Sequence, residues 1–352
     1  MFSRTTIQEM DVRVTPGRSA ARTGVLLVNL GTPDKPTPGA VRRYLRAFLG
    51  DSRVVEIPRL LWKPLLEGVV LPFRPRRVAK AYAAIWHHDT DESPLRYYTR
   101  RQGERLQQRF AQGSLDIEVA WAMRYGEPSV ERGIDRLMAA NCTEIILAPL
   151  YPQYSATTTA TVNDAAFAHL AQLRDQPGIA TIHDFHDHPA YIDGVAESLS
   201  RAMAVGSRPD HLLVSFHGLP ERNGVLGDPY AKQCRATAER VRRVLHLSEA
   251  GYSVAFQSQF GRQKWVGPST QSEVVRLAKS GVRHLMIIAP GFMADCLETL
   301  EEVRVEIRDL FVKAGGERLT YVPCLNDSDS AIDVLEAVVL DRLVGVPTAN
   351  RR

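Results

Sequence analysis

The segment Leu212-Leu213-Val214-Ser215-Phe216-His217-Gly218-Leu219-Pro220 decides the fold, because it has a counterpart near the N-terminus in Leu26-Leu27-Val28-Asn29-Leu30-Gly31-Thr32-Pro33. Each is a continuous apolar run that stops at a glycine and a proline, which is the pattern of a parallel strand covered by helices on both faces. The later copy holds one extra residue before its glycine. The two segments predict similar buried strands in the two halves of the chain.

Two further pairs of segments match in the same order. Residues 119–126 match 254–261, each followed by a Pro-Ser pair at 128–129 and 268–269, and residues 145–149 match 286–290. Three matches in one order indicate an internal duplication.

Helical patterns separate the predicted strands. Residues 131–140 precede the strand at 145–149, and residues 271–280 precede the strand at 285–289. This alternation indicates an α/β fold with parallel sheets. We therefore predict two similar doubly wound, Rossmann-like domains with an active-site cleft between them, because such folds bind ligands beyond the carboxyl ends of their strands.

The domain limits follow from the duplication. Residues 1–22 are polar, lack the apolar core of a secretory signal and are expected to form a disordered extension. The first domain takes residues 23–162 and a C-terminal helix at 331–345, and the second domain takes residues 163–330 and carries the metal site. The first copy is the longer one, and residues 50–100 form its insert.

The insert contains an unusual apolar stretch over residues 57–73, interrupted by Pro58, Pro64 and Pro72. Apolar stripes at helical spacing usually belong to a core. An apolar lip over the cleft, which grips a flat greasy ligand or touches a bilayer, is an alternative of equal weight.

Composition excludes several classes of function. A formal net charge of +4 over 352 residues, without a dense Lys/Arg tract, argues against nucleic-acid binding. No apolar run approaches the roughly 20 residues needed to span a bilayer. The four cysteines are widely spaced and suit a reducing cytoplasm.

His217 is expected where a buried strand ends. A histidine in that position is more often a satisfied structural residue than a ligand. The acidic segment at residues 295–302 follows another predicted strand, and its presence favours a ligand or catalytic role for His217 over a structural one. A histidine facing carboxylates supplies what is needed to hold a metal and move protons.

The acidic segment predicts a helix. Asp295 is expected to cap a helix that continues to Arg308. This helix would place Glu298, Glu302 and Glu306 on one face. Glu298 lies closest to the strand end and is the carboxylate expected to point into the cleft.

A second cluster of histidines is also a candidate metal site. His183, His186 and His188 have a spacing that suits zinc, but Asp184 and Asp187 interleave with them and no cysteine lies nearby. A polar connecting loop is the favoured interpretation.

The chain resembles the ferrochelatase family from residue 24 to about 341. The motifs that carry this resemblance are Val28-Asn29-Leu30-Gly31-Thr32-Pro33, Met123-Arg124-Tyr125-Gly126-Glu127-Pro128, Tyr151-Pro152-Gln153-Tyr154-Ser155, Ser215-Phe216-His217-Gly218-Leu219-Pro220, Gly227-Asp228-Pro229-Tyr230, Phe256-Gln257-Ser258, Trp265-Val266-Gly267-Pro268 and Pro290-Gly291-Phe292 leading to Glu298-Thr299-Leu300-Glu301-Glu302. Their order and spacing make the resemblance specific, and it implies a chelatase-like pair of Rossmann-like domains.

The resemblance implies roles for individual residues. His217 and Glu298 match the family's invariant pair and are expected to be catalytic and to bind the metal. The expected substrate-binding residues are Met123, Arg124, Tyr125 and Trp265. Which of His217 and Glu298 binds iron and which accepts protons stays open.

The implied reaction is the insertion of Fe²⁺ into protoporphyrin IX, with release of two protons, by a lyase of haem biosynthesis. Iron is the substrate, and no tightly bound cofactor is expected. An iron-sulfur cluster is not expected either, because no cysteine follows Cys324. The Arg124-Tyr125 pattern resembles proteobacterial members, which implies protoporphyrin IX.

The sequence leaves other substrates and functions open. Coproporphyrin III could be the substrate, or the chain could be a different chelatase that places cobalt or nickel in a tetrapyrrole. A non-enzymatic haem- or metal-binding protein is the other alternative, although it would not need a proton acceptor. A cytoplasmic protein is expected, as a monomer or homodimer, with peripheral contact to the inner membrane left open.

Overall fold

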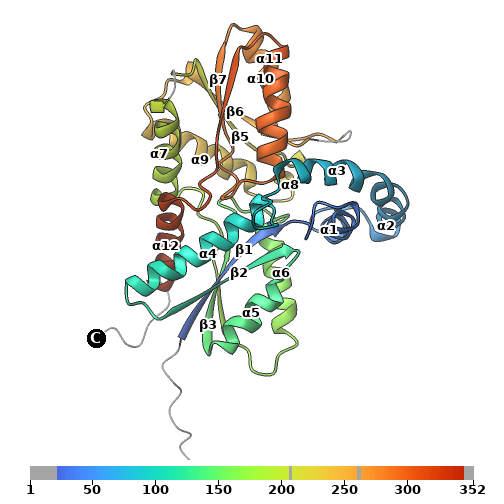
Figure 1. Ribbon diagram of the computed structural model, residues 1–352, viewed down its shortest axis with the longest axis vertical. Helices are drawn as coiled ribbons and strands as arrows, with labels where there is room; N and C mark the ends of the chain where they lie inside the picture. The colour runs from blue at the N-terminus through green and yellow to red at the C-terminus, as the bar shows by residue number, and fades with distance from the viewer. Residues whose placement is uncertain (1–21, 206–207, 260–262, 345–352) are drawn as a thin grey trace, which may run out of the picture.

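The computed structural model describes residues 22–205, 208–259 and 263–344. It contains two parallel sheets, with strand orders β2-β1-β3-β4 and β6-β5-β7-β8, which lie at opposite ends of the long axis (Figure 1). The strands are β1 (Arg22–Gly31), β2 (Ile117–Tyr125), β3 (Cys142–Pro149), β4 (Gly178–Thr181), β5 (His211–His217), β6 (Tyr252–Gln257), β7 (His284–Ile288) and β8 (Arg318–Val322). The disordered extension predicted over residues 1–22 falls outside the described residues except for Arg22, which already belongs to β1.

Both sheets place their first strand between the second and the third, so the predicted α/β fold and its duplication are confirmed. The second sequence match is out of register, however. The amide of Met123 donates to the carbonyl of Pro128 (2.7 Å), and the amide of Phe256 donates to that of Pro268 (2.9 Å). Met123 is thus equivalent to Phe256, two residues before the predicted Ser258. A shift of two residues keeps every side chain on the same face of the strand, so the apolar pattern alone does not reveal it.

Helices cover both faces of each sheet, as an all-parallel sheet requires. They are α1 (Pro38–Gly50), α2 (Arg59–Leu65), η1 (Leu66–Val70), α3 (Leu71–Ile85), α4 (Pro94–Gln112), α5 (Val130–Ala139), α6 (Thr159–Leu170), α7 (Pro189–Val205), α8 (Glu221–Val225), α9 (Tyr230–Val244), η2 (Glu249–Gly251), α10 (Thr270–Lys279), η3 (Glu298–Ile307), α11 (Arg308–Lys313) and α12 (Asp329–Val344). α5 and α6 cover one face of the first sheet, and α10, η3 and α11 cover one face of the second.

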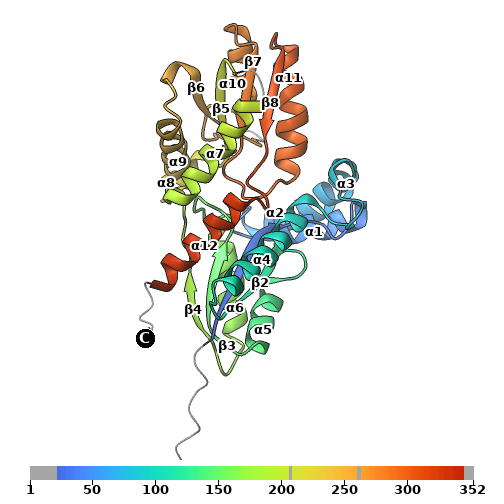
Figure 2. The same ribbon diagram turned by 60° about the vertical axis from the view of Figure 1, so that its left-hand side comes forward.

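The remaining faces of the two sheets share one core. A single cluster of buried side chains joins Leu27 of β1 and Leu106 of α4 to Val214 of β5, through Leu199 of α7 and Val334 of α12. Burial of this apolar surface is the main force that holds the halves together. α12 lies between them in Figure 2, so it belongs to both halves and not to the first domain alone.

The predicted domain boundary at residue 162 comes too early. β4 pairs in parallel with β3, through Ile145 opposite Ile179, and α6 packs on the first sheet. The first sheet therefore continues to Thr181, because the duplication includes a fourth strand that is too short and too weakly apolar to stand out in the sequence.

The insert, residues 50–100, forms a helical layer together with the preceding helix α1. α1, α2, η1 and α3 extend sideways from the first sheet (Figure 1) and bury a small core that includes Tyr44, Leu49 and Tyr82. Its outer face is apolar and exposed, with Leu60 91%, Leu61 69% and Phe73 75% exposed. This exposure is that of an apolar lip and not of a core helix.

Candidate active site

His217 is the last residue of β5 and is half-buried. Its Nδ1 lies 2.9 Å from the carbonyl oxygen of Gly218. A proton on Nδ1 makes this hydrogen bond and leaves Nε2 with a free lone pair, the form that binds a metal or accepts a proton. The strand end thus fixes both the position and the preferred tautomer of His217.

Two aromatic residues flank this histidine. The ring centroid of Phe292 lies 6.5 Å from that of His217. Trp265 forms a β-bridge with Pro220, and its ring lies 3.3 Å from the point where a Cβ on Gly218 would stand. The same Cβ would lie 2.7 Å from the carbonyl oxygen of Gln257, so only glycine permits this close packing beside His217.

Glu298 opens the π-helix η3 and is half-buried. Gln257 connects it to the histidine. Gln257 lies opposite His217 in the pairing of β5 with β6, and its Nε2 donates to the backbone carbonyl of Glu298 at 3.1 Å. Gln257, the strand neighbour of His217, therefore holds the backbone at Glu298 against the end of the second sheet.

The helix begins differently from the prediction. Its N-cap position is Leu297, without a side-chain cap. Asp295, which the sequence predicts as the cap, does not cap this helix. The Asp295 carboxylate is 4% exposed and accepts hydrogen bonds from Thr299 (3.0 Å), Tyr321 (2.5 Å) and Asn326 (2.7 Å). Asp295 therefore anchors the start of η3 to the end of β8, because a buried carboxylate must be fully hydrogen-bonded.

Glu302 lies one turn further along η3. Burial raises its pKa, the hydrogen bonds from Ser258 and the charge of His217 lower it, and the charge of Glu298 raises it again, with a net increase. These influences place the three groups in one electrostatic cluster. Glu306, by contrast, is exposed and lies 3.8 Å from Arg77.

Tyr44 of α1 and Tyr82 of α3 complete this side of the site, and sequence reasoning missed them. Tyr44 and Tyr82 are buried, with ring centroids 6.5 Å apart. Burial raises both pKa values, and the negative charge of Glu298 raises them further. Their phenols therefore stay protonated near Glu298. In sequence they look like ordinary core aromatics of amphipathic helices, which is why no signal marks them.

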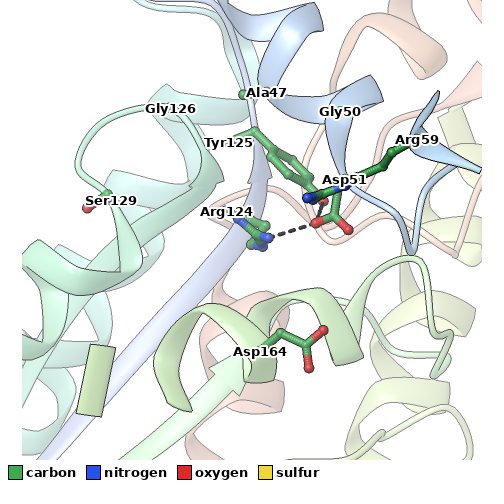
Figure 3. A pocket seen from close by; sticks show the side chains of 9 residues that line it. All are labelled: Ala47, Gly50, Asp51, Arg59, Arg124, Tyr125, Gly126, Ser129 and Asp164. Carbon is green, nitrogen blue, oxygen red and sulfur yellow. Dashed lines mark hydrogen bonds and ion pairs between the residues drawn. The ribbon is translucent and has the colours of Figure 1, made fainter. Parts of the chain in front are cut away.

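Arg124 and Tyr125 line a cavity of about 400 Å³ in the first half of the chain (Figure 3). One oxygen of Asp51 accepts hydrogen bonds from both, at 2.7 Å from Arg124 and 2.8 Å from Tyr125. The Arg124 guanidinium also lies 4.5 Å over the Tyr125 ring. Arg59 enters this cavity from α2 and is exposed.

The predicted site residues thus fall into three groups. His217, Glu298 and Trp265 gather at the carboxyl end of β5 and the start of η3. Arg124 lines the cavity in Figure 3 with Tyr125. Met123 is fully buried within β2 and offers no surface to a ligand in this conformation.

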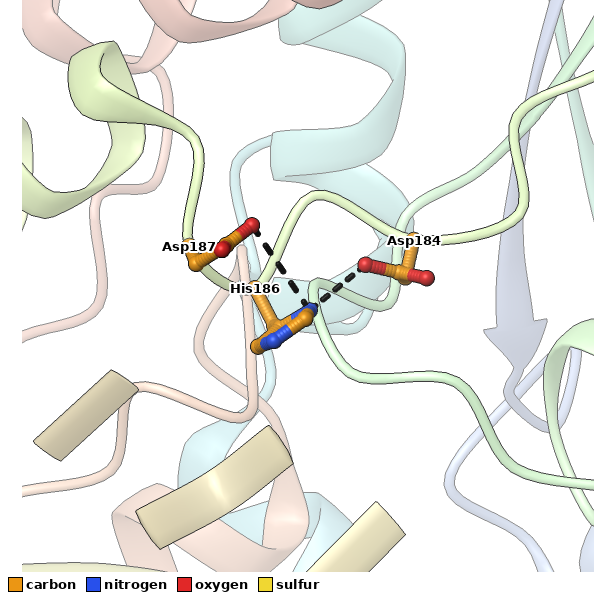
Figure 4. Close-up of side chains that lie close together, drawn as sticks. All are labelled: Asp184, His186 and Asp187. Carbon is orange, nitrogen blue, oxygen red and sulfur yellow. Dashed lines mark hydrogen bonds and ion pairs between the residues drawn. The ribbon is translucent and has the colours of Figure 1, made fainter. Parts of the chain in front are cut away.

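The second histidine cluster is a network of hydrogen bonds and ion pairs, of which Figure 4 shows His186 between Asp184 and Asp187. Asp184 accepts from His183 (2.6 Å) and His186 (2.5 Å), and Asp187 pairs with Arg240 at 3.0 Å. The ligand atoms of Asp184, His186 and Asp187 lie within 4.8 Å of one another. These atoms already satisfy one another, as expected of a polar connecting loop.

Comparison with known proteins agrees with the geometry. The ferrochelatase family model matches residues 22–343. The chain belongs to the ferrochelatase family. It is 48% identical over 334 residues to the ferrochelatase of Agrobacterium fabrum, which covers 95% of this chain and 96% of that protein. It is 47% identical over 335 residues to the ferrochelatase of Bordetella pertussis, with coverage of 95% and 92%.

Solved structures of chelatases share the fold. The sirohydrochlorin chelatase SirB of Bacillus subtilis subspecies spizizenii, in complex with cobalt, matches with a TM-score of 0.53 and 9% identity over 91% of this chain and 95% of that one. SirB from Bacillus subtilis with Fe³⁺ matches with a TM-score of 0.51 and 12% identity, with the same coverage. The predicted family membership and chelatase-like fold are both confirmed.

The described residues include no helix with the length and apolar character that a membrane span requires.

Proposed function

We propose that this chain is a ferrochelatase, a lyase that inserts Fe²⁺ into protoporphyrin IX to form protohaem and releases two protons. The observation that carries the proposal is that β5 ends at His217 where Gln257, its neighbour on β6, hydrogen-bonds the backbone carbonyl of Glu298 at the start of η3. Membership of the ferrochelatase family supports the same activity.

The chemistry explains the need for this pair. Metallation removes two N–H protons from the porphyrin, so a base must stand at the macrocycle. An imidazole with a free Nε2 accepts such a proton or holds the ion, and imidazole with carboxylate suits Fe²⁺. Glu298 supplies the carboxylate, and Glu302 lies further along the helix to carry protons away.

The remaining substrate contacts are part of the proposal. Trp265 stands beside His217 and offers a flat apolar surface to a macrocycle. Arg124 and Tyr125 are proposed to meet a propionate. Because Asp51 already binds both side chains, a propionate there must compete with that carboxylate. Met123 is proposed to support these contacts from within β2, where its side chain is buried.

We propose that the enzyme works without a tightly bound cofactor or an iron-sulfur cluster. The cysteines Cys142, Cys234, Cys296 and Cys324 are buried. Burial raises the pKa of each thiol. Since the thiolate is the form that ligates iron, the four residues suit packing better than ligation.

We also propose a peripheral location at the cytoplasmic side of the inner membrane. The exposed lip residues Leu60, Leu61 and Phe73 form an apolar surface, and exposed basic residues stand beside it at Lys63 and Arg74. An apolar face bordered by basic residues binds anionic bilayers.

The test is anaerobic metallation of protoporphyrin IX and, separately, of coproporphyrin III with Fe²⁺. The wild type should metallate protoporphyrin rapidly, His217→Ala should lose at least about 100-fold in rate, and the surface variant His88→Ala should keep the wild-type rate. A higher rate with coproporphyrin III would identify that porphyrin as the substrate. Metallation of neither would favour the binding-protein alternative.

A further inference from the structure

Ser258 holds an unusual position directly after β6. Its backbone φ is 61°, in the left-handed region that residues other than glycine rarely adopt. In this conformation its amide donates to Oε1 of Glu302 at 2.7 Å, and its hydroxyl donates to Oε2 of the same carboxylate at 2.5 Å. One residue therefore contacts both oxygens of Glu302.

We infer that Ser258 is a positioning residue of the metallation reaction, which fixes the Glu302 carboxylate for proton transfer away from His217 and Glu298. This inference rests on the proposed ferrochelatase activity and extends it to a residue outside the predicted site. Ser258 acts only through Glu302 and is not assigned a contact with iron or porphyrin.

The geometry favours this role over a simple tether. Gln257 already ties β6 to η3 through the carbonyl of Glu298, so a second link is not needed for that purpose. Gln271 adds only a long contact of 3.4 Å to Oε1 of Glu302. The two donors of Ser258 are thus the short, charge-assisted bonds that orient the carboxylate.

The residue type supports the same conclusion. Glycine would adopt a φ of 61° without strain, whereas serine is strained in that conformation. Serine adds what glycine lacks, a hydroxyl that reaches Oε2 of Glu302. Ser258→Gly is consequently a suitable variant, because it deletes that donor without adding backbone strain.

The experiment is a double-mutant cycle with Ser258→Gly, Glu302→Gln and the double variant, measured by anaerobic metallation of protoporphyrin IX. Ser258→Gly should lower kcat about ten-fold, as expected for one hydrogen bond to a charged group, with KM for the porphyrin within about two-fold. Adding Ser258→Gly to Glu302→Gln should cause no further loss. Ser258→Asn, which tolerates a positive φ and keeps a side-chain donor, should recover part of the rate.

A stability control separates positioning from folding. Ser269 caps α10 by accepting a hydrogen bond from the amide of Ser272 at 3.1 Å. Ser269→Ala should lower the melting temperature because the helix loses its cap, and should leave kcat unchanged. A comparable fall in kcat for Ser269→Ala would show that the Ser258 effect is structural and would overturn the inference.

The outcomes distinguish this inference from the activity on which it rests. Wild-type kcat in Ser258→Gly, or additive losses in the double variant, overturns the role of Ser258 and leaves the enzyme a ferrochelatase. A wild-type rate in Glu302→Gln would show that Glu302 does not contribute to the reaction, and this too would overturn the role of Ser258 while leaving the enzyme a ferrochelatase. Absence of metallation in the wild type overturns both proposals.

Discussion

The anchor of the acidic helix allows a quantitative prediction. The buried Asp295 carboxylate accepts hydrogen bonds from Tyr321, Thr299 and Asn326. Tyr321→Phe removes one oxygen atom and keeps the shape of the ring, so Asp295 loses one of its three side-chain donors. A hydrogen bond to a charged group contributes about 1.5–3 kcal/mol. We expect the free energy of unfolding to fall by that amount.

The assay is urea denaturation followed by both tryptophan fluorescence and far-UV circular dichroism. Tyr252→Phe is the matched control, because the Tyr252 hydroxyl is buried and has no hydrogen-bond partner among the described residues. Removal of that hydroxyl should change stability by no more than about 0.5 kcal/mol, or should increase it. Equal stability of Tyr321→Phe and wild type, or an equal loss in the control, would refute the anchoring role of Asp295.

Three further predictions concern other parts of the fold. Gly31→Ala places a Cβ 1.9 Å from the carbonyl oxygen of Tyr125 at a φ of +118°, so it should destabilise by more than about 4 kcal/mol, whereas Gly39→Ala, with open space around it, should keep the wild-type melting temperature. Burial raises the pKa of Asp184, but hydrogen bonds from two histidines prevail and lower it from 3.8 to about 2. Its contribution is therefore present above pH 4 and lost toward pH 2, and the stability difference between wild type and Asp184→Asn should shrink over that range in acid titrations; a constant difference would contradict this. Phe73→Glu, on the exposed lip, should weaken sedimentation with anionic vesicles and leave kcat on detergent-solubilised porphyrin unchanged, and undiminished vesicle binding would exclude the lip as the contact.

Much of the site was predictable because its residues end apolar strands. The run up to His217 and the glycine after it predict a strand end, and the order of the family motifs adds Glu298. The tyrosines Tyr44 and Tyr82 were not predictable, because burial and amphipathic spacing give the same pattern whether or not a carboxylate lies nearby. The substrate-binding role of Met123 stays a prediction, and its motif gives no sign that the side chain is enclosed in the sheet.

The α/β class, the duplication and the family follow from the sequence, because local apolar periodicity and motif order are properties of the chain alone, and the same motifs predict His217 and Glu298 as the catalytic pair. Tertiary structure decided the register of β6, the place of β4 in the first sheet and the role of Asp295. It also decided which residue holds Glu302. These features depend on hydrogen bonds between segments far apart in sequence, such as Ser258 to Glu302 and Asp295 to Asn326, and local patterns carry no information about which distant partner satisfies a buried polar group.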